Sequence, residues 1–271
     1  MRRLTRDGVD LTYDDDGTGP AVLLSHCWLC DARQWPQARA VAQAGYRVLN
    51  LDNRGHGRSG PHQGRYTLWD VAEDLRAVLD DAEEERAVVV GLSIGGYAAL
   101  RLALRHPSRV RALVLAATTA GVESRWGRVK ARTLAPLFVT PARPLLMPAV
   151  LNLLFGPTAL RMQPALIAEW RQRFLAQDPG SMTSAFNAAI VRRDDVTSQL
   201  GRISVPTLVI AGEEDPGLPA AAAMAAAIAG ARFVTLPATG HLSALESPGR
   251  FEAVLLDFLH DLDGPLRPTR V

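Results

Sequence analysis

Apolar residues along the chain fall into two kinds of segment. Residues 21–25 form a short, continuously apolar run, which is typical of a strand buried on both faces of a sheet. Residues 68–82 carry apolar side chains every three or four positions, which predicts an amphipathic helix. By these criteria the predicted strands are 11–14, 21–25, 46–51, 87–90, 110–117, 207–211 and 232–236, and the predicted helices are 68–82, 95–106, 220–229 and 247–262. Strands that alternate with helices predict an α/β fold with a mostly parallel sheet.

The alternation stops between about Thr118 and Leu200, where the sequence is helical in character and rich in proline. Repeated prolines break helices, so this stretch is expected to form several short helices and bends. The strand pattern resumes near Val205. We therefore expect one core formed by residues 1–117 and 201–271, with residues 118–200 inserted as a helical cap.

Composition narrows the class of protein. With 48% hydrophobic and 21% charged residues, the chain is expected to be globular. No apolar run reaches the roughly 18 residues of a membrane span, and the amino terminus has no apolar signal region. The two cysteines cannot form a disulfide framework, and free thiols are typical of the cytoplasm, where we expect this protein. The net charge is only +2 and the arginines are scattered among acids, so we expect neither a membrane nor a nucleic-acid partner.

The sharpest chemical signal is the G-x-S-x-G motif at residues 91–95. It follows the predicted strand 87–90 and precedes the predicted helix 95–106. A serine hydroxyl is a weak nucleophile, and a sharp turn at a helix start exposes Ser93 to a base while aiming the next N–H at a developing oxyanion. Glycines at 91 and 95 suit the close approach of strand and helix. The alternative is a coincidental glycine-rich turn, but the strand–turn–helix context favours the nucleophile.

Four further motifs stand at predicted strand ends in the order of a known superfamily. They are His26-Cys27-Trp28, the D-x-R-G-x-G-x-S turn at 52–59, the acidic turn at 212–216 and Gly240-His241-Leu242. With the serine motif, they make nearly the whole chain resemble the α/β-hydrolase superfamily, and most closely 3-oxoadipate enol-lactonase-like esterases. The resemblance implies the α/β-hydrolase fold, a mostly parallel sheet flanked by helices with an inserted helical cap.

The resemblance also implies a role for each site residue. Ser93 would attack an acyl carbonyl, His241 would accept and return the proton, and Asp215 would orient the imidazole. The backbone N–H groups of Trp28 and Ile94 would form the oxyanion hole. No cofactor and no metal is implied.

Several residues compete for these roles. His26 is the rival of His241 as the base, but it precedes the oxyanion position. The remaining histidines are expected in the arginine–glycine turn, at the surface or at helix ends: His56, His62, His106 and His260. Glu213 and Glu214 adjoin Asp215, but their spacing from the strand and the following Pro219 favour Asp215 as the acid.

Cys27 departs from the family pattern, because the family has glycine after the histidine of this loop. A side chain here is expected to border the acyl site and to narrow the oxyanion hole. Cys27 and Cys30 also form a C-x-x-C pair, which raises the alternatives of redox chemistry and metal binding. The chain length and the serine motif favour the hydrolase interpretation instead.

The sequence thus predicts a serine hydrolase that cleaves a small-molecule carboxylic ester or lactone through an acyl-enzyme. Cofactor-free perhydrolases of the haloperoxidase type and C–C bond hydrolases share the same triad and remain alternatives, as does a non-catalytic, ligand-binding member of the fold. In the cap, Trp126 and Trp170 join Cys27 as candidate substrate contacts. Basic residues outnumber acidic ones in the cap, which favours an anionic substrate unless they only form a solvated surface.

Overall fold

An eight-stranded sheet runs through the protein, in the order β1-β2-β4-β3-β5-β6-β7-β8. The computed structural model describes residues 1–62, 64–141 and 143–264. The strands are β1 (Arg2–Arg6), β2 (Val9–Asp16), β3 (Ala21–Ser25), β4 (Arg47–Asp52), β5 (Ala87–Leu92), β6 (Val110–Ala116), β7 (Thr207–Gly212) and β8 (Arg232–Leu236). β1 and β2 pair antiparallel with each other and β2 pairs antiparallel with β4, whereas every later pairing is parallel. The expected α/β fold with a mostly parallel sheet is confirmed.

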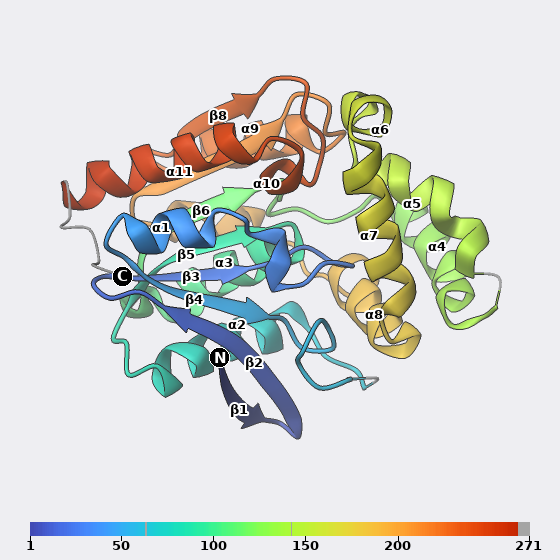
Figure 1. Cartoon of the computed structure of the whole chain (residues 1–271), viewed down its shortest axis with the longest axis horizontal. Coiled ribbons are helices and arrows are strands. Elements are labelled where there is room, and N and C mark those ends of the chain that lie inside the picture. Colours follow the sequence, from blue (N-terminus) through green and yellow to red (C-terminus); the bar gives the residue numbers. More distant parts are fainter. Residues whose placement is uncertain (63, 142, 265–271) are drawn as a thin grey trace.

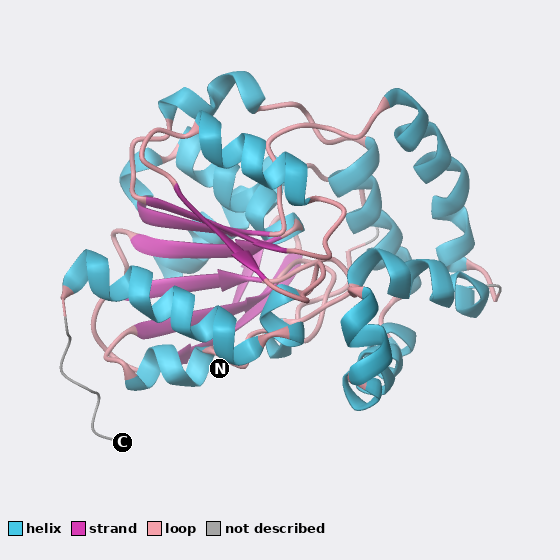
Figure 2. Cartoon of the chain, turned by 90° about the horizontal axis from the view of Figure 1, so that it is seen from above, coloured by secondary structure: helices cyan, strands magenta, loops and turns pink. Residues whose placement is uncertain are grey.

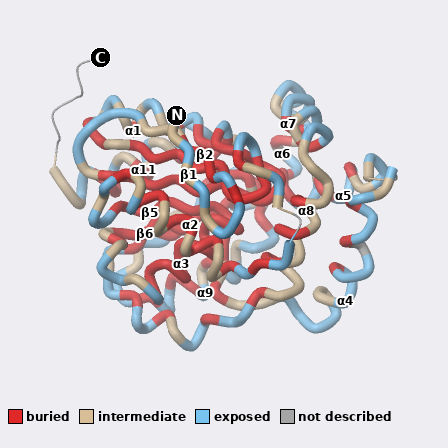
Figure 3. Tube along the Cα trace, turned by 90° about the horizontal axis from the view of Figure 1, so that it is seen from below, coloured by how far each residue is buried: buried red, intermediate tan, exposed pale blue. Residues whose placement is uncertain are grey.

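Helices cover both faces of this sheet (Figures 1 and 2). α1 (Ala38–Gln43) and α11 (Pro248–Asp263) lie in front of the sheet in Figure 1, and α2 (Leu68–Asp81), α3 (Ile94–Arg105) and α9 (Leu218–Ala227) lie behind it. Because both faces are covered, the central strands are buried along their whole length, as the red tube in Figure 3 shows. No described helix is long and apolar enough to cross a membrane.

A helical insertion separates β6 from β7. It consists of α4 (Arg125–Leu134), η3 (Ala135–Val139), η4 (Arg143–Leu146), α5 (Met147–Leu154), α6 (Pro157–Met162), α7 (Pro164–Ala176), α8 (Pro179–Phe186), η5 (Asn187–Val191) and η6 (Thr197–Arg202). Four of its α-helices, α5, α6, α7 and α8, carry proline in their first turn, where the missing N–H has no intrahelical partner anyway. Figure 2 shows the arrowheads of the parallel strands pointing toward this insertion. Loops that follow those strands therefore meet the insertion, which is where α/β proteins bind ligands.

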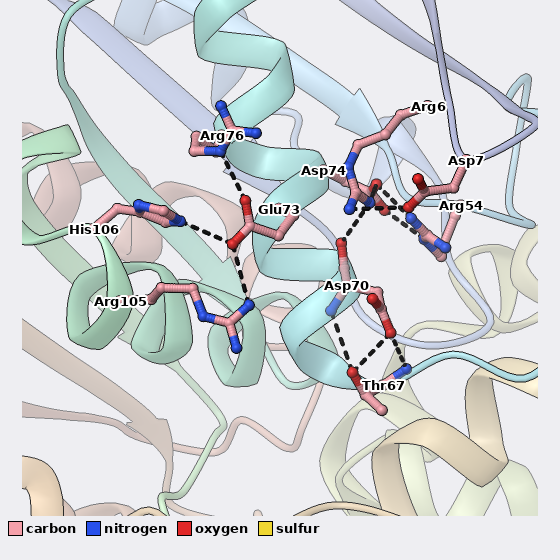
Figure 4. A network of polar contacts seen from close by, with 10 residues as sticks. All are labelled: Arg6, Asp7, Arg54, Thr67, Asp70, Glu73, Asp74, Arg76, Arg105 and His106. Atoms are coloured by element: carbon pink, nitrogen blue, oxygen red, sulfur yellow. Dashed lines mark hydrogen bonds and ion pairs between the residues drawn. The ribbon is translucent and has the colours of Figure 1, made fainter.

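A buried ion pair fixes the turn that follows β4. The guanidinium of Arg54 donates two hydrogen bonds of 2.5 Å to the carboxylate of Asp74 on α2, and Arg6 of β1 donates to the same carboxylate (Figure 4). Asp74 is wholly buried, so removing either arginine donor would leave a buried charge with fewer partners. The arginine–glycine turn is thereby tied to the helix layer behind the sheet, which is a structural role.

The same helix is fixed at its start and to α3. Thr67 and Asp70 form a capping box, in which each side chain accepts from the backbone N–H of the other. Further along α2, Glu73 accepts from Arg76 and Arg105 and lies 2.8 Å from Nε2 of His106 (Figure 4). The end of α3, the helix that begins next to Ser93, is held in place by these contacts.

Candidate active site

Ser93 occupies a strained turn between β5 and α3. Its φ is +54° and its ψ is −112°, a conformation that L residues rarely adopt. A Cβ at position 91 would collide with the backbone of Gly95, and one at position 95 would collide with the carbonyl of Ser25. The Ser93 N–H donates to the carbonyl of Ala116 at 2.9 Å, which anchors the turn to β6. Glycines at 91 and 95 thus allow the tight turn that the sequence motif predicts.

His241 and Asp215 form the second part of the site. Asp215 follows β7 and His241 follows β8, and Nδ1 of His241 lies 3.0 Å from Oδ2 of Asp215. The other carboxylate oxygen of Asp215 accepts from the N–H of Gly217 at 2.8 Å, so the carboxylate is held from both sides. Ser93, Asp215 and His241 all line one cavity of about 510 Å³. A larger cavity of about 900 Å³ is lined by polar residues such as Asp31 and contains none of these three.

The two partners shift each other's pKa in opposite directions. Burial alone would lower the pKa of His241, but the hydrogen bonds and charges of Asp215 and Cys27 more than offset this, and the pKa lies well above its usual value. Burial alone would raise the pKa of Asp215, but the hydrogen bond and charge of His241 and the hydrogen bond from Gly217 together outweigh burial, and the pKa is lowered. Asp215 is therefore a stable anion beside an imidazole that binds a proton readily.

The two residues expected to donate to the oxyanion line the same cavity. Ile94 is the first residue of α3, so its N–H has no partner within the helix. Trp28 lines the cavity and is fixed by its indole, which donates to the carbonyl of Met182 at 3.0 Å. Neither backbone N–H donates to any residue that the structure describes. Both remain free to bind an anionic oxygen.

Cys27 reaches into the cavity beside these groups. It is buried and lines the cavity together with Ser93 and His241. Burial raises the pKa of this thiol, but the combined influence of Cys30, His241 and Ser93 outweighs burial and lowers the pKa to about 5. Cys30 does not line the cavity, and burial raises the pKa of its thiol. The two cysteines are free thiols.

The competing residues are held elsewhere. Nε2 of His26 accepts a hydrogen bond from the N–H of Asn53 at 2.9 Å, and its Nδ1 lies 2.7 Å from the carbonyl of Cys27. Both ring nitrogens therefore contact backbone groups. Glu214 binds Thr158 of the insertion, and Glu213 accepts the N–H of Ala238 at 3.0 Å. Neither glutamate has a hydrogen bond to His241 among the described residues.

The two cap tryptophans do not line the cavity, contrary to the expectation from sequence. Trp126 lies at the start of α4 with 76% of its surface exposed. Trp170 is buried in the insertion, where its ring stacks on Phe174 and meets Phe155 edge to face. Trp170 and Phe174 form the buried face of α7, which packs inside the insertion. The apolar spacing around Trp170 in the sequence therefore reflects this packing. Cys27, the third candidate contact, does line the cavity.

A residue that the sequence did not single out supports the loop of His241. The carboxylate of Glu246 accepts from the backbone N–H groups of Gly156, Gly240 and Leu242 at 2.9–3.0 Å. It therefore joins the residues on either side of His241 to the insertion. A glutamate shortly after the histidine motif was visible in the sequence, but only the fold brings Gly156 to it.

Comparisons with known proteins agree with this architecture. A family model described as the alpha/beta hydrolase fold matches residues 20–248. The chain belongs to the alpha/beta hydrolase family. The enol-lactonase from Burkholderia xenovorans LB400 is similar in structure, with a TM-score of 0.87 and 31% identity over 95% of this chain and 99% of that one. A thermophilic esterase from Thermogutta terrifontis has a TM-score of 0.89 and 28% identity, covering 97% and 99%.

A curated relative extends the range of chemistry. The "Putative carbamate hydrolase RutD" of Azorhizobium caulinodans is 32% identical over 263 residues, which is 94% of this chain and 96% of the relative. The relatives of this alpha/beta hydrolase thus include a carbamate hydrolase, an esterase and a lactonase. These relatives place the chain among the hydrolases.

Proposed function

We propose that this alpha/beta hydrolase is a serine hydrolase that cleaves a small-molecule carboxylic ester or lactone through an acyl-enzyme. Oγ of Ser93 attacks the carbonyl carbon while Nε2 of His241 takes the hydroxyl proton. The negative charge that develops on the carbonyl oxygen is held by the N–H groups of Trp28 and Ile94. His241 then gives its proton to the leaving alcohol as the C–O bond breaks.

The second half of the reaction reverses the roles. His241 takes a proton from a water molecule, and the hydroxide attacks the acyl-enzyme carbonyl. The bond to Ser93 breaks, its oxygen recovers the proton and the carboxylic acid is released. With a lactone the leaving alcohol remains attached to the acyl group, so a single hydroxy acid leaves.

The observation that carries this proposal is the 3.0 Å contact between His241 and Asp215, two residues that line one cavity with Ser93. Because Asp215 accepts the Nδ1 proton, neutral His241 keeps its lone pair on Nε2. That tautomer is the one a general base needs. The strained backbone of Ser93, with its hydroxyl at a helix start, further supports its assignment as the nucleophile.

We also assign residues 118–200 to a cap over the site. Phe186 and Ile190 of the insertion line the same cavity as Ser93, so an acyl group bound there would lie between the core and the insertion. Their side chains and Leu154 give this part of the cavity an apolar wall. An acyl chain with an apolar segment fits that wall.

Covalent labelling tests the proposal. A fluorophosphonate probe should add one label to the wild-type protein, and tryptic mass spectrometry should locate it on Ser93. Ser93→Ala should remain unlabelled, while Ser243→Ala, a buried serine outside the cavity, serves as the matched control. Labelling at another residue, or of the Ser93→Ala protein, would overturn the assignment.

A substrate panel should accompany the labelling. It should contain p-nitrophenyl esters of increasing chain length, simple lactones and aryl carbamates. Carbamates are included because the acyl-transfer steps are the same and because of the relative from Azorhizobium caulinodans. Turnover of esters or lactones above that of carbamates supports the proposal, and the reverse order would replace it with carbamate hydrolysis.

A further inference from the structure

Arg193 brings a buried positive charge to the wall of the cavity that holds Ser93 and His241. It lies between η5 and η6 of the insertion and is 3% exposed. Its guanidinium lies over the ring of Tyr97, 4.1 Å from the centroid. Within the part of the chain that the structure describes, its side chain makes one hydrogen bond, from Nη2 to Glu123, which is long at 3.5 Å. Nε and Nη1 are buried and have no partner among the described residues.

This arrangement is unlike that of the other deeply buried arginine nearby. Arg101 is wholly buried, but it donates to the carbonyls of Tyr97 and Asp194 and to the carboxylate of Asp194 at 2.6–3.2 Å. A guanidinium carries five N–H donors, and leaving them unfilled away from water costs free energy. Arg101 meets this demand within the protein, whereas Arg193 does not.

The carboxylates next to Arg193 in sequence are committed elsewhere. Asp194 binds Arg101 and the indole of Trp69, and Asp195 accepts the N–H of Thr197 at 2.8 Å. The third carboxylate close to Arg193 belongs to Glu123, which is distant in sequence. Glu123 also lines the cavity, and its side chain is 45% exposed. Glu123 therefore touches Arg193 loosely and can turn to solvent.

We propose that Arg193 is an anion-binding subsite of this cavity and takes a carboxylate carried by the substrate away from the scissile ester. The proposal rests on the serine hydrolase function proposed above and specifies its substrate class, an ester or lactone that also bears a free carboxylate. The incoming carboxylate replaces Glu123 and fills the unpartnered donors of the guanidinium, for which a planar, bidentate carboxylate is the best match. The apolar wall formed by Phe186 and Ile190 accommodates the chain between the two ends of such a substrate.

The test compares two substrates of the same shape. One is a p-nitrophenyl monoester of glutaric acid, and the other is the corresponding glutaramate ester, in which an uncharged amide replaces the free carboxylate. Wild-type enzyme should prefer the acid in kcat/KM by about 10- to 100-fold, the range that charged hydrogen bonds contribute. In Arg193→Gln this preference should fall close to one, and Arg193→Lys should retain part of it. Glu123→Gln removes the competing carboxylate and should increase the preference.

The matched control is Arg171→Gln, which removes an exposed insertion arginine that lies outside the cavity. It changes the net charge equally and should leave the preference unchanged. If Arg193 only clamps Tyr97 and Glu123, Arg193→Gln will lower the melting temperature while the preference remains that of wild type. That result, or an equal preference for acid and amide in the wild-type enzyme, would overturn the proposal. Glu123→Gln and Arg193→Lys test it even if Arg193→Gln does not fold.

A binding measurement separates this proposal from the hydrolase function. Calorimetry on Ser93→Ala should show that monomethyl glutarate binds more tightly than methyl glutaramate, again by about 10-fold or more. If wild-type enzyme hydrolyses neither ester but this difference in affinity is present and is lost with Arg193→Gln, the hydrolase function fails and the subsite stands. Equal affinities for the two ligands would refute the subsite whatever the turnover.

Discussion

The carboxylate of Glu246 accepts the backbone N–H of Gly240 at 2.9 Å, and Gly240 immediately precedes His241. The same carboxylate holds the N–H of Leu242 on the other side of the histidine. Burial raises the pKa of Glu246, although these backbone hydrogen bonds oppose the rise. The position of the imidazole therefore depends on a buried side chain that does not itself reach the cavity.

Glu246→Gln should reduce kcat by about 10- to 100-fold with little change in KM, because an amide offers one acceptor oxygen where three N–H groups converge. Steady-state kinetics of the variant would measure this. Glu252→Gln, on α11 outside the loop, is the matched control and should retain wild-type kcat. Wild-type kcat in Glu246→Gln would show that the loop of His241 does not need this carboxylate.

The pH dependence of kcat/KM should reflect the raised pKa of His241. The base must be neutral, so activity is absent when His241 is protonated and rises with pH through its pKa. Because Asp215 and Cys27 raise that pKa, the rising limb should lie above the ordinary histidine value of about 6.5. A pH–rate profile already at its plateau by about pH 6 would contradict this reading of the site.

Cys27→Gly should move the same limb toward lower pH, because it removes one of the groups that raise the pKa of His241. It should also preserve turnover or broaden acceptance of bulky acyl groups, since the Trp28 N–H is retained and space is gained. A limb that stays in place would show that the Cys27 thiol does not interact with His241. Cys30→Ser is the control, because Cys30 lies outside the cavity.

Alkylation of Cys27 should block ester turnover. Its thiol has a lowered pKa and borders Ser93, so iodoacetamide should react there and fill the space that the substrate carbonyl needs. Peptide mass spectrometry would follow the modification alongside activity. Full activity after verified alkylation would place Cys27 away from the acyl group. Equal loss of activity in Cys27→Gly and Cys30→Ser would instead favour redox chemistry of the pair.

Local sequence signals predicted the central strands well, because a short, continuously apolar run such as β3 is typical of a strand buried on both faces of a sheet. The short helix α1 was not predicted, since it buries only Val41. The positions of Ser93, Asp215 and His241 could be proposed because each follows a strand within a recognisable turn.

What the sequence could not supply depends on contacts between distant segments. Glu246 acts on Gly156, which is 90 positions away in the chain. Nothing in the sequence distinguishes Arg193 from the other arginines. Only the fold shows that it is buried with its guanidinium over the ring of Tyr97. The spacing of Trp170 in the sequence predicts a buried residue, whether the side chain packs inside the insertion or lines the cavity. Only its packing on Phe174 of α7 shows that it lies inside the insertion.

The central claim is that Ser93 is the nucleophile of an ester hydrolase. The most direct measurement is the turnover of the best p-nitrophenyl ester by Ser93→Ala, with circular dichroism to verify the fold. We expect turnover to fall to the residual level of enzymes that lack a triad member, about 10³–10⁴-fold above the uncatalysed reaction. A folded Ser93→Ala protein that keeps a substantial fraction of wild-type kcat would contradict the account.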